Sequence, residues 1–374
     1  METGKLKTRK KRVVVALSGG VDSSVAAALL KEEGHEVIGI SMQLYDQSKL
    51  EDTRFDSCCS LKEVDVARRV AQILEIPYYV LNFEDVFQDK VVNYFVDEYL
   101  KGRTPNPCVR CNTDVKFHHL IRKARELNAD YLATGHYVRN LYNETLGEYE
   151  LLKAKDRQKD QSYFLFGTDP KELPFLLFPL GDLTKPEVRA IAQKYNLPNA
   201  HKAESMEICF IPSNNYKAFI QEHLEEKGEN LDTGGEIISE DGSSIGKHEG
   251  YHHYTIGQRK GLGISNPAHP LYVLDVNQSS KTVTVGSEDK LYMDGLIVQN
   301  VNWLRQPSSP NIHLKIRHSQ TEIEASLEQA GDSQTFKVYF HKPHKSVCPG
   351  QAAVFYEDET LLGGGWIDRG FHKK

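Results

Sequence analysis

The chain carries two cysteines, Cys108 and Cys111, in a loop rich in proline and arginine, Gly102-Arg-Thr-Pro-Asn-Pro-Cys-Val-Arg-Cys-Asn112. Arginines beside thiols favour the thiolate, which is the nucleophilic and metal-binding form. Another cysteine, Cys209, follows about a hundred residues later in Met206-Glu-Ile-Cys-Phe-Ile-Pro212. From the residues alone three interpretations of the pair stay open: reactive thiols that Cys209 joins in space, half of a zinc site, or a buried thiol pair.

The remaining cysteines, Cys58, Cys59 and Cys348, are interpreted as structural, because adjacent cysteines chelate a single ion poorly. Six cysteines in 374 residues are too few for a disulfide scaffold. In a reducing compartment such thiols indicate catalysis, redox chemistry or metal binding.

A second chemically promising segment is Ser18-Gly-Gly-Val-Asp-Ser-Ser24, which lies between two apolar runs, residues 13–17 and 25–30. The pattern predicts a strand, a turn and a helix. Such a turn suits a pyrophosphate group, because glycines let backbone N–H groups approach, hydroxyls add donors, and the helix N-terminus is partly positive. The alternative is a purely structural Gly-rich turn. Asp22 either supports Mg²⁺ near the phosphates or caps the helix.

Elements that can position these residues follow from the hydrophobic pattern of the first half. Strands are predicted at residues 13–17, 37–40, 78–81 and 131–134, and helices at 63–74 and 83–95. The capping box Thr184-x-x-Glu187, with Pro186 in the first turn, predicts a helix towards Tyr195. Alternating strands and helices indicate an α/β fold with a parallel sheet, whose ligands bind outside the carboxyl ends of the strands.

Beyond Cys209 the pattern changes. A helix is predicted at residues 216–226, and Asp241-Gly242 indicates a hairpin, followed by the basic segment Gly257-Gln-Arg-Lys-Gly-Leu-Gly263. From about Leu271 the residues alternate, as at 282–285, 313–317 and 336–340, which is typical of a small antiparallel β-barrel or sandwich.

The overall charge and hydropathy exclude several classes. A formal net charge of −6 disfavours a protein that binds polyanions through bulk charge. A local cluster of Lys and Arg can still contact phosphates. Residues 5–12 are such a cluster, and the alternative is that they form a solvated tail. No apolar run approaches the ~18–20 residues that span a membrane, and the basic start lacks a signal sequence. We expect a cytoplasmic protein without membrane association.

Many ordered motifs resemble those of the tRNA-specific 2-thiouridylases of the bacterial and organellar type, which are ATP pyrophosphatases. They cover essentially the whole chain: Ser18–Ser24, Gly102–Pro107 with Cys111-Asn112, Ala133-Thr-Gly-His-Tyr137, Lys159-Asp-Gln-Ser-Tyr-Phe164, Ile208-Cys-Phe-Ile211, Thr255-Ile-Gly-Gln-Arg-Lys-Gly-Leu-Gly263, Pro349-Gly-Gln-Ala-Ala-Val-Phe-Tyr356 and Leu362-Gly-Gly-Gly365. The resemblance implies three domains: a parallel-sheet ATP pyrophosphatase (adenine nucleotide alpha hydrolase-like) domain at 1–214, a small central domain at 215–290, and an antiparallel β-barrel at 291–374.

The resemblance also implies roles for individual residues. The ATP-binding positions are Ala16, Leu17, Ser18, Gly19, Gly20, Val21, Asp22, Ser23, Met42 and Gly135, and the contacts to the target base are Asn106, Pro107 and Cys108. The positions that contact tRNA are His136 (which is also next to the active site), Lys159, Asp160, Gln161, Arg317, His318 and Gln351. Cys111 falls at the catalytic nucleophile and Cys209 at the cysteine that receives a persulfide.

The implied reaction is the ATP-dependent 2-thiolation of the wobble uridine, position 34, in tRNAs with Glu, Gln and Lys type anticodons. ATP, with Mg²⁺, converts the poorly leaving C2 oxygen into an adenylate and releases pyrophosphate. Sulfur from the Cys209 persulfide then attacks C2, while Cys111 releases it as hydrosulfide or forms a disulfide with Cys209. The base leaves its stack to reach the thiols. A sulfur-relay protein or a cysteine desulfurase is the expected donor.

One position departs from the family pattern. Many members have an aspartate where this chain has Cys108, so Cys108, Cys111 and Cys209 form a set of three thiols. Three cysteines can hold a [4Fe–4S] cluster with one iron open to sulfide. The alternative is that Cys108 is a neutral replacement that contacts the base.

Two other classes of function are weighed against this one. Amidating synthetases and a lysine-attaching tRNA ligase share the phosphate loop but have no need of three thiols, so amide formation rather than sulfur incorporation would identify them. A non-catalytic RNA-binding protein with a zinc-stabilised loop would bind zinc and not turn over ATP. The intact phosphate loop disfavours this last class.

Overall fold

The computed structural model describes residues 10–45, 61–203, 208–211, 215–229, 231–264 and 269–373. The chain divides into two compact units. The first is formed from residues 1–88, 113–162 and 169–210, and the second from residues 89–112, 163–168 and 211–374. The segments 89–112 and 163–168 belong with the second half of the chain, so the two units do not coincide with the three predicted domains. The domain limits 1–214, 215–290 and 291–374 stay a prediction.

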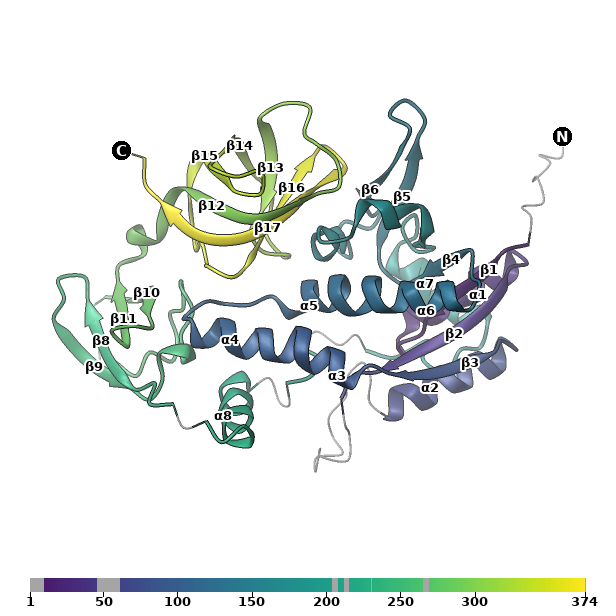
Figure 1. The fold of residues 1–374 in the computed structure, drawn as a ribbon, viewed down its shortest axis with the longest axis horizontal. Helices are drawn as coiled ribbons and strands as arrows, with labels where there is room; N and C mark the ends of the chain where they lie inside the picture. Colours follow the sequence, from purple (N-terminus) through teal and green to yellow (C-terminus); the bar gives the residue numbers. More distant parts are fainter. Residues whose placement is uncertain are drawn as a thin grey trace. The chain divides into compact units, whose positions relative to one another are not determined.

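The first unit is built on a five-stranded sheet in the order β3-β2-β1-β4-β7 (Figure 1). The strands are β1 (Arg12–Ala16), β2 (Glu36–Gln43), β3 (Tyr78–Asn82), β4 (Tyr131–Ala133) and β7 (Leu176–Leu177). Every neighbouring pair is parallel. The predicted parallel α/β sheet is confirmed, with β7 as an additional edge strand.

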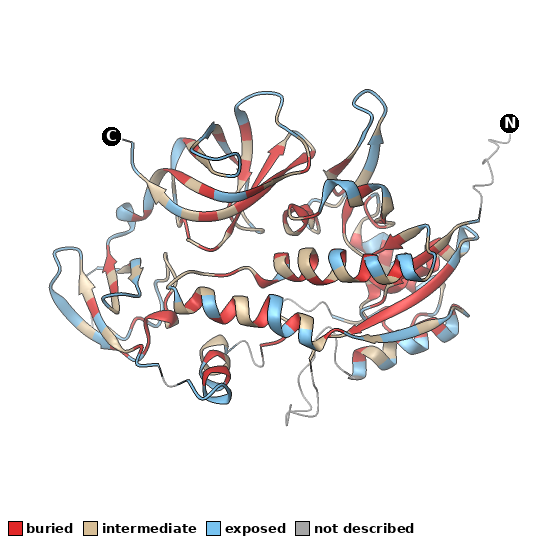
Figure 2. Cartoon of the chain, viewed as in Figure 1, coloured by how far each residue is buried: buried red, intermediate tan, exposed pale blue. Residues whose placement is uncertain are grey.

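The core of the first unit lies where β1 and the helix α1 (Val21–Glu32) meet (Figure 2). Val13, Val14 and Val15 have no exposed surface, because a central parallel strand is covered on both faces. Small alanines let α1 approach the sheet closely, and Ala26 and Ala27 are also fully buried. The helix α7 (Lys185–Lys194) packs into the same core and begins with the predicted capping box.

Further helices of the first unit are α2 (Leu61–Ile73), α3 (Glu84–Phe87) and α6 (Ile121–Glu126). Two helical runs pass from one unit to the other, each through a π-helical segment. One continues from α3 through Gln88–Asn93 to α4 (Tyr94–Leu100), and the other from α5 (Pro107–Arg110) through Cys111–Leu120 to α6. An antiparallel hairpin, β5 (Val138–Asn143) and β6 (Glu148–Lys153), was not predicted.

The second unit contains a small four-stranded sheet in the order β10-β11-β8-β9. Its strands are β8 (Gly235–Ser239), β9 (Ser244–His248), β10 (Tyr272–Asn277) and β11 (Thr282–Gly286), preceded by the predicted helix α8 (Tyr216–Glu226). The hairpin at Asp241-Gly242 is confirmed as the β8–β9 turn. The expectation that alternation from Leu271 onwards belongs to the barrel is wrong for β10 and β11, since β11 pairs in parallel with β8.

Six antiparallel strands of the second unit form the barrel, in the order β12-β15-β14-β13-β16-β17. They are β12 (Tyr292–Trp303), β13 (Asn311–Lys315), β14 (Ile323–Gln329), β15 (Phe336–Lys345), β16 (Ala352–Glu357) and β17 (Thr360–Phe371). Pairing of β12 with β17 closes the sheet, which decides for a barrel over a sandwich. Fully buried side chains such as Leu314, Val338 and Phe355 fill its interior. Among the described residues no helix is long and apolar enough to cross a membrane.

His252 makes the second unit sensitive to acid. It is 3% exposed, and neither ring nitrogen has a hydrogen-bond partner among the described residues. Burial, together with His253, His248 and Lys217, lowers the pKa of His252 to about 4. The unfolded chain accepts this proton near pH 6.5 and the folded chain does not, so stability falls as the pH drops from about 6.5 towards 4.

We therefore expect the His252→Phe variant to lose less thermal stability than the wild type over that pH range, as measured by melting temperature. His269→Gln, which changes an exposed histidine, serves as the control and should follow the wild type. Identical pH dependence of the wild type and His252→Phe would contradict the prediction.

Candidate functional site

The predicted phosphate loop lies between the carboxyl end of β1 and the start of α1. Ser23 Oγ accepts a hydrogen bond from the Ser18 N–H at 3.2 Å, and Ser24 Oγ donates to the Gly20 carbonyl at 2.9 Å. The helix starts at Gly20, which offers no side chain to cap it. The partly positive N–H groups of the first turn are thus left for an anion.

Glycine is needed twice around this loop. Gly19 has φ +77°, and a Cβ there would lie 2.5 Å from the Glu63 carbonyl oxygen. Gly135 follows β4, and a Cβ on it would lie 2.6 Å from the Ser23 nitrogen. Met42, near the end of β2, is 9% exposed. The ATP positions implied by the family resemblance therefore gather at the carboxyl ends of three neighbouring strands.

Asp22 is held by two partners in the first unit. Its carboxylate accepts hydrogen bonds from Lys185 Nζ at 2.7 and 2.8 Å and from the Tyr137 hydroxyl at 2.7 Å. The Lys185 ammonium also lies 5.7 Å from the centre of the Tyr137 ring. Asp22 lies in the first turn of α1, but these contacts tie it to α7 rather than to the backbone of its own helix.

Two more side chains brace the loop from outside. The Asn199 amide donates to the Gly19 carbonyl and to Ser24 Oγ, both at 2.9 Å. Asn199 Oδ1 is buried without a hydrogen-bond partner among the described residues. Lys202 forms an ion pair with Glu63, the residue against which Gly19 packs. These contacts fix the loop before any ligand arrives.

His136 lies immediately after Gly135. Its Nδ1 is 2.7 Å from Thr134 Oγ1, and its ring lies against Phe117 and Phe178. Burial and the nearby Lys116 charge lower the pKa of His136 to about 3. At neutral pH the side chain is therefore an uncharged hydrogen-bonding group, so it does not act on RNA as a cation.

Of the three consecutive tRNA positions in the first unit, two hold the loop itself. Asp160 is 4% exposed and accepts from the Ala154 N–H at 2.9 Å and from Ser162 Oγ at 2.8 Å. Gln161 Oε1 accepts from the Tyr137 N–H at 3.0 Å. Lys159 supplies the positive charge of this segment. Contact of these residues with tRNA stays a prediction.

Cys209 also belongs to the first unit and is half-buried. Its carbonyl oxygen accepts a hydrogen bond from the Tyr45 hydroxyl at 3.3 Å. The next residue, Phe210, packs edge-on against Phe87, with ring centroids 5.5 Å apart. The cysteine is thus attached to a packed aromatic group on one side, while residues 204–207 on its other side lie outside the described residues.

The proline-rich loop lies in the second unit. Asn106 caps α5 by accepting from the Val109 N–H at 3.4 Å, and Pro107 occupies the first turn. Cys108 is exposed and Cys111 is buried, although the two are one helical turn apart. The prolines and the cap therefore fix the start of the helix that presents both thiols.

Three of the residues predicted to contact tRNA, Arg317, His318 and Gln351, lie in the barrel part of the second unit. Gln351 Nε2 donates to the Thr104 and Pro105 carbonyls, both at 3.1 Å, so it binds the proline-rich loop. The His318 ring lies 4.6 Å from the Phe164 ring. Arg317 donates to Cys348 Sγ at 3.1 Å, and burial raises the pKa of the Cys348 thiol. Cys348 is buried, as a structural cysteine should be.

Among the described residues, no group of three or more His, Cys, Asp or Glu side chains is placed to hold a metal ion. The three-cysteine cluster therefore stays a prediction. Cys58 and Cys59 lie outside the described residues.

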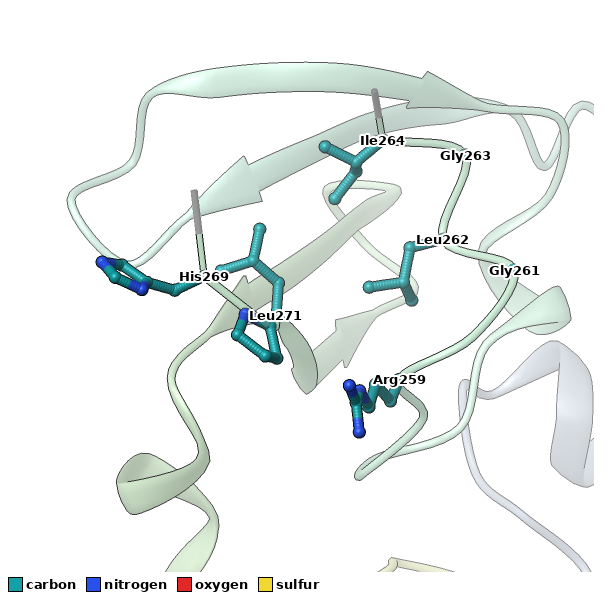
Figure 3. Close-up of a pocket in the computed structure, with 8 residues that line it drawn as sticks. Arg259, Gly261, Leu262, Gly263, Ile264, His269 and Leu271 are labelled. Atoms are coloured by element: carbon teal, nitrogen blue, oxygen red, sulfur yellow. The ribbon is translucent and has the colours of Figure 1, made fainter. Parts of the chain in front are cut away.

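A separate pocket of about 450 Å³ lies in the second unit, beside the four-stranded sheet (Figure 3). Arg259, Leu262, Ile264, His269 and Leu271 line it. Part of the basic segment Gly257–Gly263 lines this pocket, namely Arg259 and residues 261–263. None of the predicted site residues lines it.

Comparison with known families covers nearly the whole chain. Residues 11–213 match the family described as the tRNA methyl transferase HUP domain, residues 217–287 the tRNA methyl transferase PRC-barrel domain, and residues 293–367 the aminomethyltransferase beta-barrel domain. The chain is 53% identical over 371 residues to the tRNA-specific 2-thiouridylase MnmA of Geotalea uraniireducens, covering 98% of this chain and 97% of the relative. The chain belongs to the tRNA-specific 2-thiouridylase family.

Other 2-thiouridylases give the same result. The protein of Geobacter metallireducens is 50% identical over 364 residues, which is 96% of this chain and 97% of the relative. That of Carboxydothermus hydrogenoformans is 46% identical over 365 residues, covering 96% and 98%. The first domain is an ATP-binding HUP domain, and the resemblance inferred from the motifs is confirmed.

The structure adds residues that the sequence did not single out for this 2-thiouridylase, above all Lys185, Lys202 and Asn199. The sequence contains one signal for Lys185. Lys185 is the first residue of a helix, where the partly positive helix end disfavours a cation, so its charge needs an acidic partner from elsewhere. Which acid it meets depends on the fold.

Proposed function

We propose that this chain catalyses the ATP-dependent 2-thiolation of the wobble uridine of tRNA. The observation that carries the proposal is the match to 2-thiouridylases at about half identity over nearly the full length. The phosphate loop, open at the end of β1, supports the use of ATP. The thiols Cys108 and Cys111, at the start of one capped helix, support sulfur chemistry.

The reaction begins with adenylation. The uracil C2 oxygen attacks the α-phosphorus of ATP, and pyrophosphate leaves. The backbone N–H groups of Gly19 and Gly20 and the Ser18 hydroxyl bind the phosphates, and the start of α1 stabilises the charge that develops on them. Mg²⁺, which shields the same charge, would be held by Asp22 together with the phosphates.

Sulfur transfer follows. The terminal sulfur of a persulfide on Cys209 attacks C2, and AMP leaves with the former C2 oxygen. The Cys111 thiolate then attacks the Cys209 sulfur, which forms a Cys111–Cys209 disulfide and frees the thiolated base. A donor of the sulfur-relay or cysteine desulfurase class supplies the persulfide, and a thiol reductant reopens the disulfide. If a [4Fe–4S] cluster is present instead, Cys108, Cys111 and Cys209 would hold it, and it would supply sulfide in place of the persulfide.

The remaining residues position the RNA. Asn106, Pro107 and Cys108 form the wall for the extruded base, since they begin a rigid helix beside the thiols. His318, whose ring lies against Phe164, and Gln351, which donates to the proline-rich loop, bind the tRNA beside that wall. We also propose that the protein acts in the cytoplasm.

The test is a reaction with purified chain, ATP, Mg²⁺, a persulfide donor and an unmodified tRNA transcript with uridine at the wobble position. We expect 2-thiouridine by mass spectrometry of nucleosides, with AMP and pyrophosphate formed in equal amounts. A transcript with cytidine at that position, and a reaction without ATP, are the controls. Absence of 2-thiouridine under anaerobic conditions with either persulfide or sulfide would refute the proposal.

Arg317 and Lys159 are expected to bind phosphates rather than bases. Each exchange to glutamine should weaken tRNA binding and flatten its salt dependence by about one unit of log–log slope or less. Binding is measured by filter assay from 50 to 300 mM salt, roughly the range in which such slopes are read. Lys194→Gln, in a surface ion pair with Glu32, is the control. An unchanged slope would place the residue outside the RNA footprint.

A further inference from the structure

We propose that Lys185 is a phosphate-binding residue, which Asp22 holds in place until ATP arrives and which then transfers its ion pair from the Asp22 carboxylate to the triphosphate. The inference rests on the proposed use of ATP at the Ser18–Ser24 loop. It assigns to the nucleotide site a cation that the loop sequence lacks.

The loop alone does not balance the charge of a triphosphate. A triphosphate carries several negative charges, and neutral N–H and hydroxyl donors balance them only in part. The loop Ser18-Gly-Gly-Val-Asp-Ser-Ser24 contains no lysine or arginine and even adds an acid, Asp22. Mg²⁺ would balance part of this charge, but the loop offers no cation, so any positively charged side chain at the phosphates has to come from another element. Lys185 Nζ is 2.7 Å from Asp22 Oδ1, inside the first turn of the helix that begins the site.

The Lys185 ammonium is buried where a positive charge is unfavourable. Lys185 is 6% exposed, and it begins α7, where the helix dipole opposes a positive charge. A buried ammonium requires a paired anion, and Asp22 provides it. An alanine or leucine at this position would avoid the cost altogether. A buried lysine at this position is explained if its ammonium binds a phosphate of ATP.

The backbone around Lys185 is held in place by hydrogen bonds. The backbone N–H of Lys185 donates to Asp156 at 2.9 Å, and Glu187 accepts from the Thr184 N–H at 2.6 Å, so the start of α7 is fixed on both sides. Tyr137 fixes the other end of the ion pair through its hydroxyl. Only the lysine side chain has to move for the ammonium to reach a phosphate oxygen. Asp22 is then released to Mg²⁺.

A purely structural role makes a different prediction. If Lys185 does no more than neutralise Asp22, replacing it costs no ATP affinity once Asp22 is already Asn. If Lys185 binds phosphate, the double variant binds ATP more weakly than Asp22→Asn alone. Because both variants lack the carboxylate that would hold Mg²⁺, the comparison of Asp22→Asn with Asp22→Asn/Lys185→Met separates the two roles.

The experiment measures the dissociation constant of Mg²⁺-ATP by calorimetry on the full chain, without tRNA. We expect Lys185→Met to bind about 10- to 100-fold more weakly than the wild type, and Asp22→Asn/Lys185→Met to bind more weakly than Asp22→Asn by a factor in the same range. Lys185→Arg should recover part of the affinity. Lys194→Met, which changes a lysine in the last turn of the same helix that is paired with Glu32, should bind like the wild type.

Equal affinity of Asp22→Asn and the double variant, or wild-type affinity in a folded Lys185→Met protein, would overturn the assignment while leaving the thiolation proposal intact. A wild-type chain that binds no ATP would instead overturn the proposed use of ATP and, with it, the role of Lys185. Melting curves of each variant show that the fold is kept. A Lys185→Met variant that does not fold leaves Lys185→Gln and Lys185→Arg as the pair to compare.

Discussion

Replacing Cys111 with serine is expected to abolish the formation of 2-thiouridine while pyrophosphate release from ATP continues. Adenylation precedes sulfur transfer and needs no thiol, whereas serine forms no disulfide with Cys209. Loss of a nucleophile of this kind lowers turnover by about 10³-fold or more. Cys209→Ser should give the same result with a persulfide donor. The two products are measured in one single-turnover reaction by nucleoside mass spectrometry and a pyrophosphate assay.

Cys348→Ser is the matched control, because it changes another buried cysteine and keeps a donor for the Ile256 carbonyl. It should thiolate at the wild-type rate. Retention of 2-thiouridine formation in Cys111→Ser would contradict the assignment of the nucleophile.

Cys108→Ser decides between the two sulfur carriers. With a cluster, the three cysteines fail together, so the variant loses iron, the brown colour and sulfide-dependent thiolation after anaerobic purification. With two working thiols, the colourless, iron-free variant still thiolates with a persulfide donor. Iron and sulfide are measured on the same preparations.

Ser18→Ala and Asp22→Ala are expected to slow adenylation by about 10²-fold or more, since each removes a group that stabilises charge on the phosphates in the transition state. Asp22→Ala also leaves the buried Lys185 ammonium unpaired, so its melting temperature should fall as well. Pyrophosphate release with saturating tRNA is the measurement. Glu32→Ala, in the last turn of the same helix, is the control. Wild-type rates would refute the phosphate-loop assignment.

The parts that the sequence predicted well are locally determined. Three consecutive valines, a Gly-Gly turn and an alanine-rich run are sufficient to predict β1, the loop and α1, because each step needs only neighbouring residues. The capping box at Thr184 likewise predicted the start of α7. The order of motifs then identified the family, and with it the barrel.

Other features depend on contacts between distant residues. β7 has only two residues, and the β5–β6 hairpin is polar enough to resemble a loop. That β11 joins β8 in parallel, and that Lys185 meets Asp22, follow from tertiary packing and have no local signature. The same holds for Asp160, whose acidic side chain predicts exposure and whose hydrogen bonds bury it.

The hydrogen bonds from Gln351 to Thr104 and Pro105 join segments that are far apart in the chain. The Thr104 N–H donates in turn to the Pro349 carbonyl at 2.8 Å. The loop and the barrel turn at Pro349 and Gln351 are therefore joined by hydrogen bonds to which the loop contributes backbone atoms alone. A chimaera with the barrel of a distant homologue keeps the side-chain bonds only if that barrel has a glutamine at the position of Gln351; otherwise the loop that begins the helix with both thiols loses these two contacts.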